Sequence, residues 1–512
     1  MDHLLYGLAV NPALPAALVE RLIDVADAEM AGALAERGDL SAGQALKLVK
    51  RQPETAVELA EAGVLTVDSV DPLVAPVVAL ALLGRGAGDP EWTRRFAVDP
   101  AVEHRVRLAA CPGLPEDVVE VLAGDVEAVV VAGLAEATTS VEVVARLAGH
   151  PHAEVRKALA GNEVAPPAVL ASLITGEGLP PLTGCLVCDR ETVPFVHDRE
   201  CPRADCDLRT GASCDGSHES TVWETHLLAL GNPTTPLDAV IGFLDHPMWL
   251  FRERLAARPD LPPEAYRRLA ADPVPGVRWA LAENPAIGDA VIRELAREDT
   301  HVRRQVALNP RVPLDVLADL AVTTKIGPTL VPRIATATQA EVQNLALSPT
   351  AALRMLLAHR RDLPARVRDV LAADHDAKVV KAIAPDPGLS ETQLRAMIDR
   401  HGTQVLGAVA RNPAASSALL EDVVRHLPPS HKAFRAIAEH PNATAPALLA
   451  CLDDDRARPL AAAHPALPPE TISELLTDDD GWTAQAAAAN PSLPPEVMAS
   501  LVGESRRRLD GS

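Results

Sequence analysis

The sequence predicts an all-α protein built as a solenoid of short helical repeats. Three observations predict it: prolines recur at a nearly constant interval, apolar residues between them recur at helical spacing, and segments that alternate strictly enough to be strands are missing. The chain of 512 residues is also longer than one ordinary core supports. Hydrophobic residues make up 48% and aromatic residues only 2%, which favours thin repeated layers over one large globular core.

The clearest repeated feature is an Asn-Pro pair or a close variant of it. Successive prolines of these pairs lie 26, 26 and 25 residues apart from Pro233 to Pro310, and 28, 24 and 26 apart from Pro413 to Pro491. Self-similarity at a period of about 25 residues is typical of repeat architectures. The pairs are Asn11-Pro12, Cys111-Pro112, Asn232-Pro233, Arg258-Pro259, Asn284-Pro285, Asn309-Pro310, Asn412-Pro413, His440-Pro441, His464-Pro465 and Asn490-Pro491. Where histidine replaces asparagine, we expect a structural turn residue rather than a ligand.

The first helix of each unit is expected to begin just after this pair. A second proline often follows three residues later, where its fixed φ and missing N–H suit a helix start. Apolar residues return seven and ten residues after the first proline, and this spacing of three places both on one helical face. Examples are Tyr266 and Leu269, Ile292 and Leu295, Leu317 and Leu320, Ile472 and Leu475, and Met498 and Leu501.

A second, shorter helix is expected after a turn such as Ala271-Asp272-Pro273. Val277 and Leu281 share one face of this helix in one unit, and Val302 and Val306 do so in the next. Each unit therefore has an apolar face that it cannot bury alone. Stacking on neighbouring units would bury it in one continuous core with local contacts only.

The pattern resembles the leucine-rich repeat variant family. The resemblance rests on an NPxLPxxxLxxLA-type segment, as in Asn309–Ala321, and a VRxAVA-type segment, as in Val302–Ala307, and it covers most of the chain outside 181–222. In that family an α-helix alternates with a short 3₁₀ helix, without strands, in a right-handed superhelix. The resemblance implies the same right-handed superhelical solenoid here.

A cysteine-rich insertion at 181–222 interrupts the repeats. It separates an N-terminal helical repeat array, 1–180, from a C-terminal one, 223–505, which is followed by a tail, 506–512. Five of the seven cysteines lie in this insertion. So short a segment holds few residues to bury and is expected to need a crosslink, such as a bound metal, to keep one shape.

The insertion contains two close cysteine pairs, Cys185-x2-Cys188 and Cys201-x4-Cys206, separated by twelve residues. Two such pairs are the usual arrangement for a tetrahedral thiolate site, because each pair fixes two ligands on one tight turn. We therefore predict these four cysteines as metal ligands. The alternates, which spacing does not exclude, are Cys214, His218 and His197.

Zinc is the expected metal, since four thiolates in this spacing suit its tetrahedral geometry. Iron–sulfur alternatives stay open. A 4Fe-4S cluster also uses four cysteines. Some members of the leucine-rich repeat variant family carry a cysteine-rich iron–sulfur module beside their repeats, and the resemblance implies the same four cysteines as its ligands. The letters Cys214-Asp-Gly-Ser-His218 also match the CDGSH iron–sulfur signature, but that family has a Cys-x-Cys pair upstream, where only Cys206 stands here.

Composition and motifs favour a binding protein over an enzyme. No nucleophile elbow, Walker loop or His-Glu-x-x-His motif is present. We expect a non-enzymatic protein-interaction scaffold, in which a structural zinc module splices or orients the two arrays. The net charge of −22 disfavours nucleic acid and favours a protein partner with a basic patch. The alternative functions are an iron–sulfur redox or iron-responsive repeat protein and a zinc-module nucleic-acid binder.

The expected compartment is the cytoplasm. Clustered cysteines favour metal binding over disulfides in a reducing environment. No apolar run approaches the ~20 residues of a membrane helix, and the N-terminus lacks the basic segment of a signal peptide. We therefore expect no membrane association.

Overall fold

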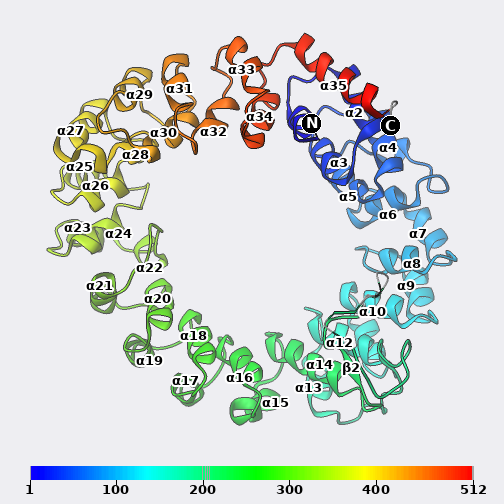
Figure 1. The fold of residues 1–512 in the computed structure, drawn as a ribbon. Coiled ribbons are helices and arrows are strands. Elements are labelled where there is room, and N and C mark those ends of the chain that lie inside the picture. Colours follow the sequence, from blue (N-terminus) through cyan, green and yellow to red (C-terminus); the bar gives the residue numbers. More distant parts are fainter. Residues whose placement is uncertain (1, 199, 202, 204–205, 207, 510–512) are drawn as a thin grey trace. The chain divides into compact units, whose positions relative to one another are not determined.

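The computed structural model describes residues 2–198, 200–201, 203, 206 and 208–509 and confirms the all-α repeat prediction (Figure 1). Across those residues, strands occur only in one two-stranded antiparallel sheet inside the insertion. The chain divides into two compact units, which we name unit 1 (Met1–Val64 and Val312–Ser512) and unit 2 (Leu65–Arg311). In the described part of the chain, no helix has both the length and the apolar character needed to span a bilayer.

Unit 2 contains the insertion and the repeats around it. Its elements are η2 (Val67–Ser69), α6 (Pro76–Gly84), α7 (Pro90–Phe96), α8 (Val102–Ala109), α9 (Glu116–Ala123), α10 (Ala128–Ala137), α11 (Val141–Leu147), α12 (Ala153–Gly161), α13 (Pro167–Thr175), β1 (Phe195–Val196), β2 (Ser213–Cys214), α14 (Glu219–Gly231), α15 (Leu237–Val240), η3 (Ile241–Asp245), α16 (Trp249–Ala256), α17 (Pro263–Ala270), α18 (Pro275–Glu283), α19 (Asp289–Leu295) and α20 (Thr300–Leu308).

Unit 1 combines the first and the last repeats of the chain. Its elements are α1 (Asp2–Val10), α2 (Ala16–Val25), α3 (Ala28–Ala35), α4 (Ala42–Arg51), η1 (Pro53–Thr55), α5 (Ala56–Glu61), α21 (Leu314–Thr323), α22 (Pro332–Ala335), α23 (Gln339–Ala346), α24 (Ala351–Leu357), α25 (Ala365–Ala372), α26 (Ala377–Ile383), α27 (Glu391–His401), η4 (Gly402–Gln404), α28 (Leu406–Val409), α29 (Ser417–Val424), α30 (His431–Ala438), α31 (Ala445–Cys451), α32 (Arg458–Ala462), α33 (Pro469–Leu475), α34 (Gly481–Ala488) and α35 (Pro495–Leu509). Residues 506–509 of the expected tail thus belong to α35, and 510–512 lie outside the described residues.

A typical repeat consists of α17 and α18. The predicted apolar pair of the first helix, Tyr266 and Leu269, is buried, and so are Val277 and Leu281 of the second. Second helices α16, α18 and α20 stack on one another along one side of unit 2, while first helices such as α17 and α19 line the other (Figure 1). The family resemblance implied a 3₁₀ second helix, but α16, α18 and α20 are α-helices of eight or nine residues.

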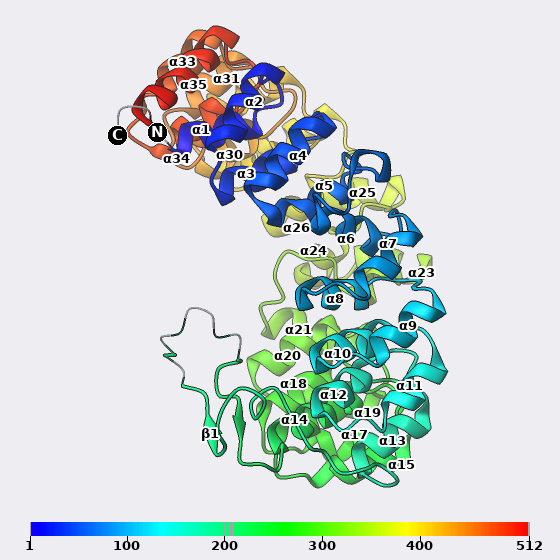
Figure 2. The same cartoon turned by 90° about the vertical axis from the view of Figure 1, so that its right-hand side faces the viewer.

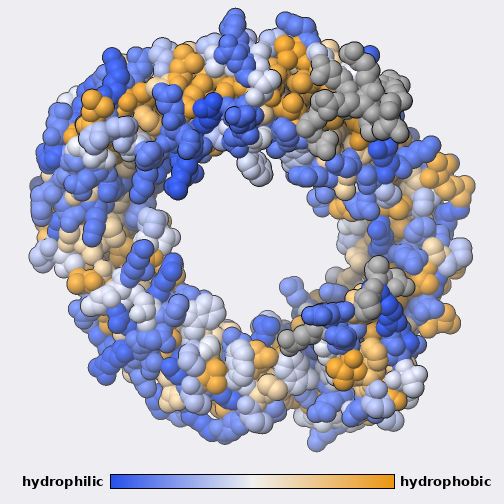
Figure 3. All heavy atoms as spheres, in the orientation of Figure 1, coloured by the Kyte–Doolittle hydropathy of each residue, from blue (hydrophilic) through white to orange (hydrophobic). Residues whose placement is uncertain are grey.

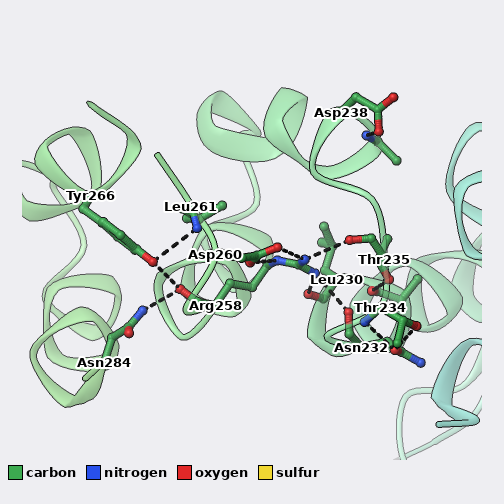
Figure 4. A network of polar contacts seen from close by, with 12 residues as sticks. Leu230, Asn232, Thr234, Thr235, Asp238, Arg258, Asp260, Leu261, Tyr266 and Asn284 are labelled. Atoms are coloured by element: carbon green, nitrogen blue, oxygen red, sulfur yellow. Dashed lines mark hydrogen bonds and ion pairs between the residues drawn. The ribbon is translucent and has the colours of Figure 1, made fainter. Parts of the chain in front are cut away.

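Recurring asparagines join neighbouring repeats, as Asn284 does in Figure 4. The buried Asn284 donates from Nδ2 to the carbonyl oxygens of Ala256 (2.8 Å) and Arg258 (2.6 Å), and its Oδ1 accepts from the N–H of Ala286 (2.8 Å). These bonds satisfy backbone groups that the end of a helix leaves without intrahelical partners. Equivalent bonds, which we call the asparagine ladder, are made by Asn11, Asn162, Asn232, Asn309, Asn412 and Asn490.

Histidine and arginine continue the ladder where asparagine is replaced. His440 Nε2 lies 2.9 Å from the carbonyl oxygen of Asn412, and His464 Nε2 lies 3.1 Å from that of His440. The guanidinium of Arg258 donates to the carbonyls of Leu230 and Asn232. The predicted structural role of the two histidines is confirmed.

The ladder of unit 1 also links the first repeat to the last. Asn11 Nδ2 donates to the carbonyls of Ala488 (2.9 Å) and Asn490 (2.8 Å), and α1 packs against α34. A Cβ at Gly7 would stand 2.3 Å from the carbonyl oxygen of Gln485, so only glycine allows this approach. The expectation of local contacts only is therefore wrong, because these residues are far apart in the sequence.

Candidate metal centre

The cysteine-rich insertion lies inside one repeat, in the loop between its first helix, α13, and its second, α14. The same loop between α17 and α18 has only four residues, 271–274. The repeat stacking continues across the insertion, since α14 packs on α12 and Asn232 donates to the carbonyls of Ala160 (3.3 Å) and Asn162 (2.9 Å). Helix α14 begins at Glu219, four residues before the expected start of the C-terminal array.

Figure 2 shows the insertion, with β1 labelled, beside the helices of unit 2. Hydrogen bonds join it to the start of α12. The N–H of Ala153 donates to the carbonyl of Gly184, and the N–H of Thr183 donates to that of Pro151, both at 2.9 Å. His152 Nε2 lies 2.9 Å from a carboxylate oxygen of Asp189. A small shared core is formed by Ala153, Cys185, Val187, Leu208 and Cys214.

Four side chains gather in this core, and we call them the first ligand group: Cys185, Cys188, Cys214 and His218. Their Sγ and imidazole nitrogen atoms all lie within 4.8 Å of one another. The Nδ1 atom of His218 lies 3.7 Å from Sγ of Cys188 and 3.6 Å from Sγ of Cys214. Three of the four residues are buried and Cys188 is half-buried, so the group could hold a metal ion out of contact with solvent.

Backbone groups help to orient the side chains of the first ligand group. The N–H of Cys185 points to Sγ of Cys188 at 3.1 Å, and the N–H of Gly216 points to Sγ of Cys214 at 3.3 Å. His218, at the start of α14, has φ +59°, the left-handed conformation that a non-glycine residue seldom adopts. Backbone strain of this kind clusters at functional sites, and here it accompanies an imidazole turned toward two thiols.

Three further side chains form the second ligand group: His197, Cys201 and Cys206. Their ligating atoms also lie within 4.8 Å of one another, and His197 Nε2 lies 3.3 Å from Sγ of Cys206. A hydrogen bond from the backbone of Arg203 and another from His197 lower the pKa of the Cys201 thiol to about 7. Cys201 in turn raises the pKa of His197.

The structure thus distributes all seven predicted side chains over two groups instead of one. Of the four predicted ligands, Cys185 and Cys188 are joined by Cys214 and His218, whereas Cys201 and Cys206 are joined by His197. Strand β1 pairs antiparallel with β2, and Phe195 lies opposite Cys214. This pairing brings the C-terminal part of the insertion next to its central part. The short Cys214-x3-His218 spacing is the sequence signal that could have indicated these two alternates as ligands of one group.

The remaining cysteines lie in the repeats. Burial raises the pKa of the Cys111 thiol to about 11 and that of Cys451 to about 12, so both are neutral at pH 7. Cys111 replaces asparagine before a proline, and its Sγ lies 3.3 Å from the carbonyl oxygen of Arg107. Both cysteines belong to the packing of their repeats and to neither ligand group.

Comparison with known protein families finds no match, and comparison with curated proteins finds none either. Among solved structures, that of an engineered protein aligns with 97% of this chain and 94% of its own at 14% identity. The TM-score of 0.12 is too low to indicate a shared fold.

Proposed function

We propose that this chain is a non-enzymatic protein-interaction scaffold of the leucine-rich repeat variant type, with a structural zinc ion held by Cys185, Cys188, Cys214 and His218. The first ligand group carries the proposal. Structural zinc sites fill all four positions with protein side chains, whereas catalytic sites keep one position for water or substrate. A closed and mostly buried set of three sulfurs and one nitrogen suits the structural class.

Distances within the first ligand group support a single ion. A tetrahedral zinc with bonds of about 2.3 Å to sulfur and about 2.05 Å to nitrogen separates those two atoms by about 3.6 Å. The two separations between His218 Nδ1 and a cysteine Sγ are 3.7 and 3.6 Å. An iron–sulfur cluster places several metal and sulfide atoms among its protein ligands and spreads them farther apart.

An iron–sulfur protein is the second candidate, because one observation favours it. Cys214 and His218, the first and last residues of the CDGSH letters, are both in the first ligand group. Elemental analysis with a visible spectrum separates the candidates. We expect colourless protein containing zinc, which the C185S/C214S variant loses from this group; brown protein absorbing near 400 nm would support the cluster instead.

Nucleic-acid binding through the insertion has less support. Two of its arginines are engaged in ion pairs, Arg203 with Glu191 and Arg209 with Glu224. Their charge is already compensated, so they offer little to a phosphate backbone. We expect no salt-dependent binding of the chain to DNA or RNA.

The scaffold surface that best fits a basic partner lies in unit 1. Trp482 is 73% exposed, and it borders a depression of about 1140 Å³ at the surface of α33 and α34. Its acidic lining residues are Asp455, Glu474, Asp478, Asp479 and Asp480, and its basic ones are Arg435, Arg456 and Arg458. An exposed tryptophan among carboxylates suits a lysine or arginine side chain, which it can contact through its ring face.

Hydrophilic residues cover most of the surface visible in Figure 3, and hydrophobic ones occur in small groups. This surface supports a charged partner over an apolar one. All seven cysteines are unpaired, which supports a reducing compartment such as the cytoplasm.

Trp482 fluorescence provides the test of the docking surface. Titration with an arginine- and lysine-rich peptide should change the emission, whereas a glutamate-rich peptide of equal length should not. The W482F variant should lose the response, and the W279F variant, altered at a half-exposed tryptophan of unit 2, should keep it. Equal responses to both peptides would contradict a charge-selective surface.

A further inference from the structure

The second ligand group is built like a metal site in its own right. Its three residues come from one short stretch, His197 to Cys206, which contributes no member to the first group. The two sulfurs and one imidazole nitrogen converge within 4.8 Å, and the His197 Nε2 to Cys206 Sγ distance is 3.3 Å. This separation is close to the distance of about 3.6 Å between a sulfur and a nitrogen ligand of one tetrahedral zinc.

The orientation of His197 is a second, independent observation. Its Nδ1 lies 3.0 Å from the backbone carbonyl oxygen of Arg209, to which only a protonated Nδ1–H can donate. The lone pair then resides on Nε2, the atom that faces Cys206. Metal-bound histidines almost always donate their other ring N–H to a carbonyl or carboxylate in this way.

The surroundings hold the imidazole in place. The side chain is 7% exposed, its ring stacks on Phe195 at a centroid distance of 6.4 Å, and the backbone N–H of His197 donates to the carbonyl of Ala212 at 2.8 Å. A buried and doubly fixed histidine presents its free nitrogen to two cysteines without further rearrangement. Such preorganisation is what a ligand needs.

We propose that His197, Cys201 and Cys206 bind a second zinc ion, separate from the ion of the first ligand group. Thiolate and imidazole together select zinc over magnesium or calcium, which prefer oxygen. Within the described residues the group has three ligands, the number that leaves one zinc position for water or for an outside ligand. Cys201 and Cys206 are half-buried, whereas the first group is mostly buried, so the second ion exchanges faster.

Metal counting on the full chain tests this inference. Native mass spectrometry should find two zinc ions per chain, one in the C201S/C206S variant and one in the C185S/C214S variant. A single ion in the unmodified chain, lost from both variants, would mean that the two cysteine pairs share one site and would overturn the inference. Two ions in C201S/C206S would overturn it as well.

Two measurements on chains that fold normally keep the test decisive. Zinc release from the unmodified chain to a chromogenic chelator should be biphasic, with the fast phase missing from H197A; one phase of one equivalent would contradict the second site. In cobalt-loaded protein, C201S/C206S should lose about two-fifths of the thiolate charge-transfer absorption, because two of five thiolate ligands are removed. The proposal of a structural zinc in the first ligand group would be contradicted separately, if the C185S/C214S variant retains both ions.

Discussion

The repeats and the insertion of unit 2 fold by different means. A repeat such as α17 with α18 buries several aliphatic side chains and satisfies its helix ends through the asparagine ladder. In its described residues, the insertion between α13 and α14 has one pair of two-residue strands, and the core that it shares with Ala153 of α12 contains five buried residues, two of which are cysteines. Neighbouring repeats therefore stabilise each repeat, whereas we expect the insertion, with so few buried apolar residues, to depend on the proposed metal.

Metal removal should give the largest effect and should act on one region only. After exhaustive chelation we expect hydrogen exchange to accelerate strongly across 182–218, because too little apolar surface remains to order this segment. Helices α16 to α20 should keep their protection, since the elements on which they mainly pack are other repeat helices.

The matched control is C111S, a cysteine substitution in a repeat outside both ligand groups. It should retain metal and the exchange pattern of the unmodified chain. Uniform loss of protection over unit 2 after chelation would show that the repeats depend on the metal too.

The ion pair between Arg252 and Asp272 is the next largest contribution, and it lies in the repeats. Its side chains are 11% and 5% exposed, with Nε to Oδ2 at 2.6 Å. Removing one member of such a buried pair costs about 3–5 kcal/mol. The D272A variant should therefore lower the free energy of unfolding of unit 2 by about that amount, measured by denaturant titration.

The same pair predicts a pH dependence. Burial alone would raise the pKa of Asp272, but hydrogen bonds from Arg252 and the backbone of Val274 outweigh it and lower the pKa below the usual 3.8. A lowered carboxyl pKa stabilises the fold above about pH 4 and loses this effect as the pH falls further. The stability difference between unmodified chain and D272A should be constant from pH 7 to 5 and shrink below pH 4; a difference that grows in acid would contradict the assignment.

The asparagine ladder gives an intermediate effect. The N284A variant leaves the carbonyl of Ala256 and the N–H of Ala286 without their side-chain partner, which costs about 1–3 kcal/mol. The N284H variant should lose less, because histidine takes this position at His440 and His464. Thermal unfolding of the three chains provides the comparison, and equal losses in both variants would argue that shape rather than hydrogen bonding matters.

The smallest effect is expected for an exposed ion pair. Arg94 and Asp117 are 50% and 57% exposed, although Nε to Oδ2 is only 2.7 Å. Solvent and salt screen such exposed pairs, which therefore contribute little to stability. A double-mutant cycle with R94A and D117A should give a coupling near zero in 0.5 M salt, and a coupling comparable to that of Arg252 with Asp272 would contradict the role given to burial.

Most of the fold could be predicted from the sequence because the residues that determine each repeat lie within that repeat. Proline fixes the start of a helix, and the spacing of Tyr266 and Leu269 fixes its buried face. The asparagine position was visible as a period, and the histidines in it were correctly interpreted as structural. The hydrogen bonds of the asparagine ladder join equivalent positions of successive repeats. The residues that make them therefore recur about every 25 residues, and this period is visible in the sequence.

The division of the ligands could not be predicted, because it depends on pairing between distant segments. Cysteine spacing groups Cys185 with Cys188 and Cys201 with Cys206, but it does not tell which group the strand β2 approaches. The stacking of α1 on α34 was invisible for the same reason. The repeat pattern is the same whether the first repeat is exposed to solvent or packs on another repeat.

The contact of α1 with α34 has a consequence for biosynthesis. Residues 2–10 leave the ribosome before residues 481–488, on which they pack and which are made more than 470 residues later. At roughly 5–20 residues per second this interval lasts about 25 to 95 seconds. During that time the face of α1 that packs on α34 is uncovered, so a nascent chain exposes apolar surface that a chaperone, or residues 481–488 of a neighbouring copy, can reach before its own are made.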